Sequence, residues 1–170
     1  MTRTSALAVS AIHFAVGPGV VVALVPWWLT GWQAAEPMPV AWPLRVLGIA
    51  MVAAATVVLV HAFARFVVEG LGTPAPVAPT ERLVVGGLYR YVRNPMYVAV
   101  VAAILGQALF LGRVELLWYA IVIAAVVAVF ARVYEEPALQ SQFGAQYEAY
   151  RQHVPGWLPR TRPWQPGDPG

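Results

Sequence analysis

The chain has 170 residues, of which 59% are hydrophobic and 11% are charged, and its mean hydropathy is +0.64. Soluble domains carry about 25% charged residues, so this composition excludes an ordinary soluble enzyme and a disordered chain. The chain has no cysteine, which excludes a disulfide-stabilised scaffold. The formal net charge of +3 is by itself too small for a nucleic-acid-binding protein. We therefore expect a single membrane domain over residues 1–170.

Uncharged, mainly apolar runs predict four membrane helices, because a spanning helix needs about 20 such residues. The predicted spans cover approximately residues 5–29, 44–66, 94–112 and 115–134. The first run is longer than the apolar core of a signal peptide, so we interpret it as a retained helix that bends near residues 17–19. The fold class is therefore all-α.

Glycine and proline positions predict the connections between these helices. A tight turn near Gly112 makes the last two spans an antiparallel hairpin, and the proline-rich run 71–79 cannot be helical throughout. Pro137 removes the amide that would bond the Val133 carbonyl, so we expect it to kink or end the fourth span. An amphipathic cytoplasmic helix should follow over residues 137–153, and the last ten residues should form a frayed tail.

The arginines orient the predicted helices, since cytoplasmic loops carry an excess of positive charge. With the N-terminus inside, only Arg45 and Arg113 lie on the outer side. The other nine are cytoplasmic: Arg3, Arg65, Arg82, Arg90, Arg93, Arg132, Arg151, Arg160 and Arg162. We expect both termini of this inner-membrane or plasma-membrane protein to be cytoplasmic. The chemically active part, approximately residues 70–97 and 132–160, should lie on the same side.

The segment 81–97 (ERLVVGGLYRYVRNPMY) is rich in arginine and aromatic residues and leads directly into the third span. One interpretation is structural: Asn94 caps the helix, Pro95 occupies its first position, and the tyrosines form an interfacial belt. The other is that the helix N-terminus, beside arginines and Gly86-Gly87, binds a carboxylate or phosphate. The two interpretations are compatible, because a helix cap can also bind a ligand.

The segment 132–136 (RVYEE) places two carboxylates at the predicted end of the fourth span. Ionisable residues at the membrane surface are functional candidates. The alternative is an ordinary ion pair between Arg132 and Glu136, which are spaced i to i+4.

The predicted amphipathic helix carries one apolar stripe that could pack, lie on the membrane or cover a cavity. The stripe consists of Leu139, Phe143, Tyr147, Tyr150 and Val154. We predict no metal site, because His13 and His61 have no second ligand at a metal-binding spacing.

Two motifs resemble the isoprenylcysteine carboxyl methyltransferases and the related membrane phospholipid methyltransferases. GLYRYVRNPMY (87–97) is similar to the family pattern GxYxxxRHPxY. EEPALQSQFGAQYEAYRQHVPGWLPR (135–160) is similar to EExxLxxxFGxxYxxYxxxVP. The resemblance covers approximately residues 70–160 and includes the intervening hairpin. Asn94 stands where the family usually has histidine, and Arg132 is one place closer to the glutamates than in the family pattern.

This resemblance implies transfer of a methyl group from S-adenosylmethionine to a lipidic or isoprenoid-like acceptor at the cytoplasmic face. It places seven residues at the cofactor: Leu83, Val84, Tyr89, Asn94, Pro95, Met96 and Tyr97. We expect three more to enclose it: Arg93, which is the arginine of the first motif, and Tyr147 and Tyr150 of the terminal helix. The resemblance places Arg132, Glu135 and Glu136 at the acceptor as catalytic residues.

The chemistry of the acceptor decides what these residues do. A carboxylate acceptor would be positioned by Arg132, whereas an amine acceptor would need Glu135 or Glu136 as a general base. We expect a membrane lipid or a small lipophilic molecule as substrate and no nucleic acid; the sequence leaves the oligomeric state open. A small four-helix transporter and a non-catalytic membrane subunit are the alternatives, and the Asn94 substitution is compatible with the latter.

Overall fold

The structure, a computed structural model, describes residues 17–70 and 82–165. The proline-rich run 71–79 and the first part of the predicted first span lie outside these residues. The described residues form helices and no strand, which confirms the all-α fold class. In chain order the elements are η1 (Val20–Leu24), α2 (Val25–Thr30), α3 (Trp42–Gly70), η2 (Gly87–Arg90), α4 (Pro95–Leu111), α5 (Val114–Phe130), η3 (Ala131–Glu135), α6 (Glu136–Phe143) and α7 (Ala145–His153).

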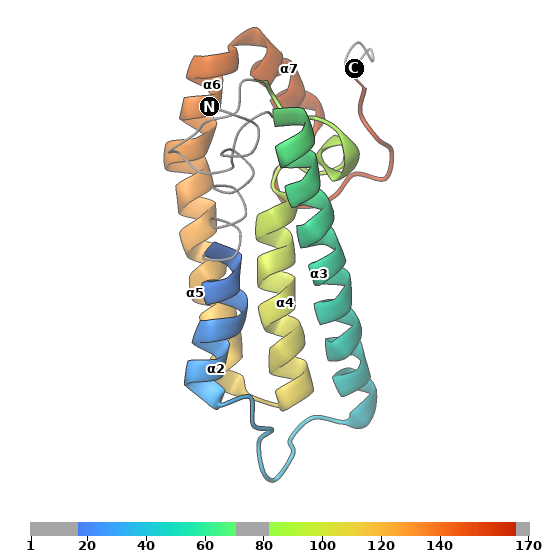
Figure 1. The fold of residues 1–170 in the computed structure, drawn as a ribbon, viewed down its shortest axis with the longest axis vertical. Coiled ribbons are helices and arrows are strands. Elements are labelled where there is room, and N and C mark those ends of the chain that lie inside the picture. The colour runs from blue at the N-terminus through green and yellow to red at the C-terminus, as the bar shows by residue number, and fades with distance from the viewer. Residues whose placement is uncertain (1–16, 71–81, 166–170) are drawn as a thin grey trace.

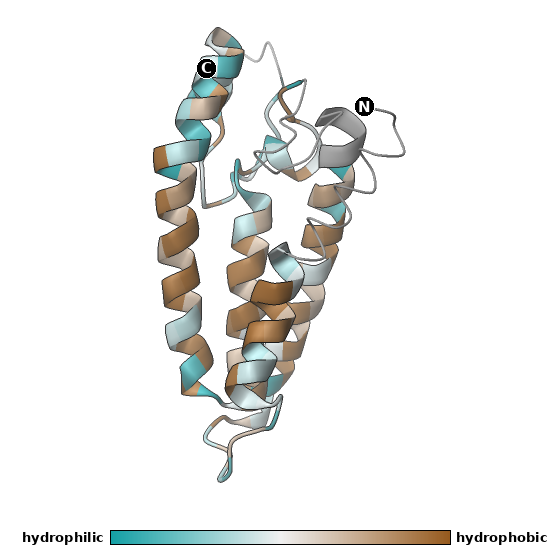
Figure 2. Cartoon of the chain, turned by 60° about the vertical axis from the view of Figure 1, so that its left-hand side comes forward, coloured by the Kyte–Doolittle hydropathy of each residue, from teal (hydrophilic) through white to brown (hydrophobic). Residues whose placement is uncertain are grey.

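The long helices run side by side, and α6 and α7 fold over one end of the bundle (Figure 1). Two helical stretches of the described chain are long and apolar enough to cross a membrane, Trp42–Arg65 and Val114–Phe143. Gly17–Thr30 and Pro95–Leu111 are apolar but shorter, so the count of four spans remains a prediction. Hydrophobic residues cover the middle of the helices, and hydrophilic residues gather towards their ends (Figure 2).

Helices α3 and α4 pack with their backbones in direct contact at two glycines. A Cβ atom added to Gly48 would lie 2.5 Å from the carbonyl oxygen of Gly106, and one added to Gly106 would lie 2.7 Å from that of Gly48. The buried core around this contact is rich in alanine, including Ala99 and Ala103. Close approach through small residues is typical of helix packing in membranes, where dispersion contacts replace the hydrophobic effect.

The turn between α4 and α5 confirms the predicted hairpin. Gly112 adopts a left-handed conformation with φ of 67° at the end of α4, and its N–H donates to the Ala108 carbonyl. Glycine suits this position because a side chain at positive φ is strained. A Cβ atom here would also meet the sulfur of Met38 at 2.8 Å.

Two wide π-helical turns each precede a proline, at Pro26 and at Pro137. In the second turn the Glu136 N–H donates to the Ala131 carbonyl, five residues back. The helix therefore passes through Pro137 and runs continuously over Val114–Phe143, so the alternative that it ends at Pro137 is wrong. The wider turn separates the proline ring from the preceding carbonyls, with which it would clash in a regular α-helix.

The first π turn is stabilised by side chains from the neighbouring helices. Gln107 Nε2 donates to the Val22 carbonyl at 2.8 Å, and the Tyr119 hydroxyl donates to the Val21 carbonyl at 3.0 Å. The Val22 carbonyl lies four residues before Pro26, which has no N–H to offer it. The polar groups of α4 and α5 therefore satisfy backbone acceptors that the N-terminal helix cannot satisfy itself.

The C-terminal region differs from the prediction in two respects. The single helix expected over residues 137–153 is instead two, because Gly144 breaks it with φ of 51° and ψ of −122°. The described part of the expected frayed tail is held in place: Trp164 is buried, and its N–H donates to the Arg90 carbonyl at 3.0 Å. Burial of this indole outweighs the disorder that a Pro- and Gly-rich composition favours.

Candidate functional site

Three segments that are distant in the sequence meet at the α6–α7 end of the bundle. The loop before α4 pairs with the C-terminal strap, which we define as residues 154–165. The Arg93 N–H donates to the Pro155 carbonyl at 2.9 Å, and the Arg160 N–H donates to the Tyr91 carbonyl at 2.9 Å. The start of α4 is therefore fixed by main-chain hydrogen bonds to residues that follow α7.

The predicted aromatic stripe packs into one cluster in spite of the break at Gly144. Tyr147, Tyr150, Val154 and Trp164 are its buried members, and Leu139 and Phe143 pack against them. The Tyr150 hydroxyl donates to the Tyr89 carbonyl at 2.7 Å. The stripe thus joins α7 to the loop before α4, which is the packing role that the sequence left open.

Arg93 is the central charged residue of the site. Its Nη1 atom lies 3.1 Å from Glu136 Oε1 and donates to the Tyr147 hydroxyl at 3.1 Å. Its Nε atom is buried and has no hydrogen-bond partner in the described structure. Glu136 therefore pairs with Arg93, and the alternative of an i to i+4 pair with Arg132 is wrong. The π-helical turn changes the helical register at η3, so that spacing no longer brings the two side chains together.

The neighbouring glutamate has a different partner. Glu135 Oε2 accepts a hydrogen bond of 3.0 Å from the Tyr97 hydroxyl. The Tyr97 ring stacks on Trp157 of the strap, with ring centroids 6.4 Å apart and an interplanar angle of 27°. The two adjacent carboxylates are thus divided between a cation and a neutral donor, and they are chemically distinct.

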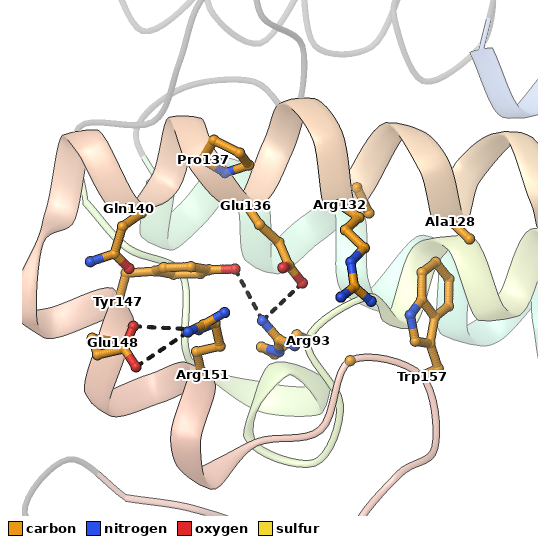
Figure 3. Close-up of a pocket in the computed structure, with 12 residues that line it drawn as sticks. Arg93, Ala128, Arg132, Glu136, Pro137, Gln140, Tyr147, Glu148, Arg151 and Trp157 are labelled. Carbon is orange, nitrogen blue, oxygen red and sulfur yellow. Dashed lines mark hydrogen bonds and ion pairs between the residues drawn. The ribbon is translucent and has the colours of Figure 1, made fainter.

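A cavity of about 810 Å³ lies between the end of α5, helices α6 and α7, and the strap (Figure 3). Its volume falls in the range of about 300–1,000 Å³ that is typical of small-molecule sites. Predicted site residues Arg93, Arg132, Glu136 and Tyr147 line it. Its other lining residues are Ala128, Ala131, Pro137, Gln140, Glu148, Arg151, Gly156 and Trp157.

A smaller cavity of about 50 Å³ adjoins the first and shares Arg93, Glu136 and Tyr147 with it. Both Glu135 and Glu136 line it, together with Leu139. It also collects seven of the ten residues predicted for the cofactor: Leu83, Val84, Tyr89, Arg93, Asn94, Tyr147 and Tyr150.

The other three predicted cofactor residues have different surroundings. Pro95 is buried at the start of α4, and Met96 packs against the two adjoining core clusters. Tyr97 contacts Glu135 through its hydroxyl and Trp157 through its ring. Neither cavity includes these three residues among those that line it.

Asn94 occupies the N-cap position of α4, but its side chain makes no capping hydrogen bond. Its Nδ2 atom instead donates to the Gly156 carbonyl at 3.1 Å, and that carbonyl also accepts the Asn94 N–H at 3.2 Å. The expected side-chain cap is therefore wrong: the amide is held through Nδ2 by the strap, and its side chain accepts no capping hydrogen bond from α4. An asparagine at this position ties the strap to α4.

Burial favours the neutral form of the tyrosines of α7. Burial raises the pKa of the Tyr147 phenol, and the nearby Arg93 guanidinium opposes this rise only in part. Burial likewise raises the pKa of Tyr150. Because the Tyr147 oxygen already accepts from Arg93, its own proton remains available for donation.

Sequence reasoning missed several cavity residues. Gln140, Glu148 and Arg151 are polar residues at helical spacing beside the aromatic stripe, and that spacing was a usable signal. Ala128, Gly156 and Trp157 gave no signal, because a small residue or a lone tryptophan near a membrane is common in packing.

Comparison with known proteins agrees with this arrangement. No curated protein matches the chain. The family model described as phospholipid methyltransferase matches residues 43–146, more than half of the chain, from the start of α3 to the start of α7. The helical bundle, the paired motifs and this match together identify a membrane methyltransferase in general terms: the chain belongs to the phospholipid methyltransferase family.

Proposed function

We propose that the protein transfers a methyl group from S-adenosylmethionine to a lipidic or isoprenoid-like acceptor that carries a carboxylate, at the cytoplasmic membrane face. The observation that carries this proposal is the convergence of Arg93, Glu136 and Tyr147 on a ligand-sized cavity beside long apolar helices. Family membership supports the reaction class. The excess of arginines at the α6–α7 end supports the choice of membrane face.

The described residues fit the amino-acid part of such a cofactor. The buried Arg93 Nε is a charged donor without an acceptor, and leaving it unpaired is costly. A ligand carboxylate would be a suitable partner for it once the neighbouring side chains that cover this atom are displaced. The Tyr147 hydroxyl and the Gln140 side chain add donors beside it, and Glu136 balances the arginine charge.

The aromatic and aliphatic residues of the smaller cavity fit the adenosine part. Leu83, Val84 and the ring of Tyr150 provide apolar surface next to Arg93. A volume of about 50 Å³ is too small for a whole nucleoside, so the ligand would extend from the larger cavity and displace side chains between the two. Arg93, Glu136 and Tyr147 line both cavities, so movement of these side chains would join the two cavities into one.

Arg132 supports a carboxylate acceptor. It lines the larger cavity, and it makes no ion pair or hydrogen bond with any described residue. Arg93 and Arg151, by contrast, are each paired with a glutamate. A guanidinium with no partner among the described residues, in a ligand-sized cavity, favours an anionic group, and its planar fork suits a carboxylate.

Catalysis would depend mainly on positioning. S-adenosylmethionine, when bound, supplies a methyl group that its sulfonium already activates. Arg132 would orient the acceptor oxygen, Arg93 would anchor the cofactor, and the aromatic cluster behind Tyr147 would exclude water. A carboxylate acceptor needs no general base, so neither glutamate has to take up a proton.

The test is S-adenosylmethionine binding to the purified protein in lipid nanodiscs, followed by transfer of a labelled methyl group into an extracted membrane lipid fraction. We expect micromolar binding and label in an alkali-labile ester. Label in an alkali-stable amine product would overturn the carboxylate assignment. Absence of binding by folded protein at millimolar cofactor would overturn the enzymatic function and favour a non-catalytic subunit.

A further inference from the structure

The larger cavity has a polar part and an apolar part. Arg93, Glu136, Gln140, Glu148 and Arg151 line the polar part between α6 and α7. Ala128 and Trp157 line the part nearest the long apolar helix α5 (Figure 3), and Ala131 of the same helical stretch also lines the cavity. This division suits a molecule with a polar head and an apolar body, which is the chemistry of the proposed acceptor.

The helix wall of the apolar part is made of small residues. Ala128 and Ala131 lie three positions apart, so they share a face of the helix. The outward-facing neighbours Val126 and Val129 are larger and are 56% and 61% exposed. Small side chains on the cavity face leave room that the larger residues of the same helix would fill.

The opposite wall is Trp157, which is held in place from two sides. Its ring stacks on Tyr97, and the preceding Gly156 accepts two hydrogen bonds from Asn94. A Cβ atom on Gly156 would lie 3.2 Å from Arg93 Nη2, so glycine allows the strap to approach this closely. Trp157 is still 39% exposed. It therefore presents a fixed aromatic surface to the cavity.

Arg132 lies one helical turn beyond Ala128 and lines the same cavity. The π-helical turn begins between these two residues, so their spacing alone does not show whether they share a face. Figure 3 shows the Arg132 side chain between Glu136 and the Trp157 ring. An anionic head held at Arg132 would therefore place the first carbons of its chain between Trp157 and Ala128.

We infer that Trp157 and Ala128 form a slot that admits one apolar chain of the acceptor and sets the width that it can have next to its carboxylate. This inference rests on the proposed function, because it assigns the acceptor to this cavity. Trp157 is in this sense a specificity-determining residue. It lies beyond the part of the chain that the family model matches.

The test uses two carboxylate probes of different width, dodecanoate and 1-adamantaneacetate, with binding measured in nanodiscs. We expect the wild-type protein to bind dodecanoate at least about tenfold more tightly than the caged probe. Trp157→Ala should reduce this preference to about threefold or less, and Trp157→Phe should retain most of it. An unchanged preference in Trp157→Ala would overturn the inference.

A second pair of variants tests the opposite wall. Ala128→Phe should weaken dodecanoate binding by about tenfold or more, since it fills the slot. Val129→Phe, one residue along and facing outwards, is the matched control and should leave binding unchanged. Equal effects in the two variants would overturn the inference.

A crosslinking measurement on the wild-type protein tests the slot even if a variant fails to fold. Dodecanoate with a diazirine near its carboxyl end should crosslink to residues 128–131 or to Trp157, and crosslinks confined to other segments would count against the slot. S-adenosylmethionine binding is measured in parallel on every variant. Cofactor binding without width selection contradicts only the slot, whereas width selection without cofactor binding contradicts the proposed function.

Discussion

The Nη1 atom of Arg93 lies 3.1 Å from Oε1 of Glu136, and the two side chains are only 15% and 27% exposed. Arg93 precedes α4 and Glu136 begins α6, so this pair joins the two sequence motifs across the helical hairpin. Removing one member of a largely buried ion pair is costly, because the remaining charge is left without its partner. The pair therefore links the two motifs, and both of its members line both cavities.

Arg93→Lys should weaken S-adenosylmethionine binding by about tenfold or more. Lysine keeps the positive charge but lacks the Nε donor and the planar fork that a carboxylate prefers. Isothermal titration in nanodiscs measures the change. Arg90→Lys is the matched control, since Arg90 donates to the Trp164 carbonyl and lines neither cavity. An equal loss in both variants would show that the effect comes from the loop and not from the ligand.

Glu135→Gln separates the two acceptor chemistries. Glutamine can still accept the Tyr97 hydrogen bond, but it cannot take up a proton. A carboxylate acceptor should retain a measurable rate, whereas an amine acceptor should lose about 100-fold or more in kcat. Tyr97→Phe is the companion variant, since it removes the hydrogen bond and keeps the carboxylate. A large loss in Glu135→Gln with a proven carboxylate acceptor would contradict the assigned role of Arg132.

Tyr147→Phe should reduce the loss of stability at alkaline pH. The folded state raises the pKa of Tyr147 above the usual value of about 10, so the unfolded chain loses its proton first. Stability therefore falls as pH rises above about 10, since the folded state then binds more protons than the unfolded state. We expect a smaller drop in Tm between pH 8 and 11 for the variant. Tyr150 contributes in the same direction, so part of the drop should persist.

Gln107→Leu should destabilise the docking of α2 by about 1–3 kcal/mol, because it leaves the Val22 carbonyl without a donor. Denaturation in mixed detergent micelles measures the change. The informative control is Pro26→Ala in the same background. It restores an N–H four residues after Val22, so it should recover part of the lost stability. Absence of any recovery would show that this hydrogen bond is not the cause.

Gly144→Ala should destabilise the α6–α7 corner by about 1–3 kcal/mol through backbone strain alone. Gly144 has φ of 51°, and no atom of another described residue lies within 4 Å of the position that a Cβ would occupy. Gly19→Ala is the matched control, since its surroundings are equally open but its φ of −63° is helical. That control should be neutral or slightly stabilising. Destabilisation of both to the same extent would exclude strain as the cause.

The sequence predicted the parts of the fold that depend on local composition. Apolar runs predicted most of the ends of α3, α4 and α5 to within a few residues. Gly112 predicted the turn between α4 and α5. The local rules failed where a distant acceptor or a change in helical register competed with them. The Asn94 side chain bonds the strap and does not cap its own helix, and the π-helical turn carries the chain through Pro137.

The sequence alone determined that the chain is helical and apolar, which family it resembles, and which segments carry its charges. Only the tertiary structure decided how those charges pair: Arg93 with Glu136, Tyr97 with Glu135, and Arg132 with no described residue. It also brought Trp157 opposite Ala128 across the larger cavity. The physical reason is that hydropathy and turn preferences act over a few neighbouring residues. The partner of a side chain depends instead on how separate helices dock.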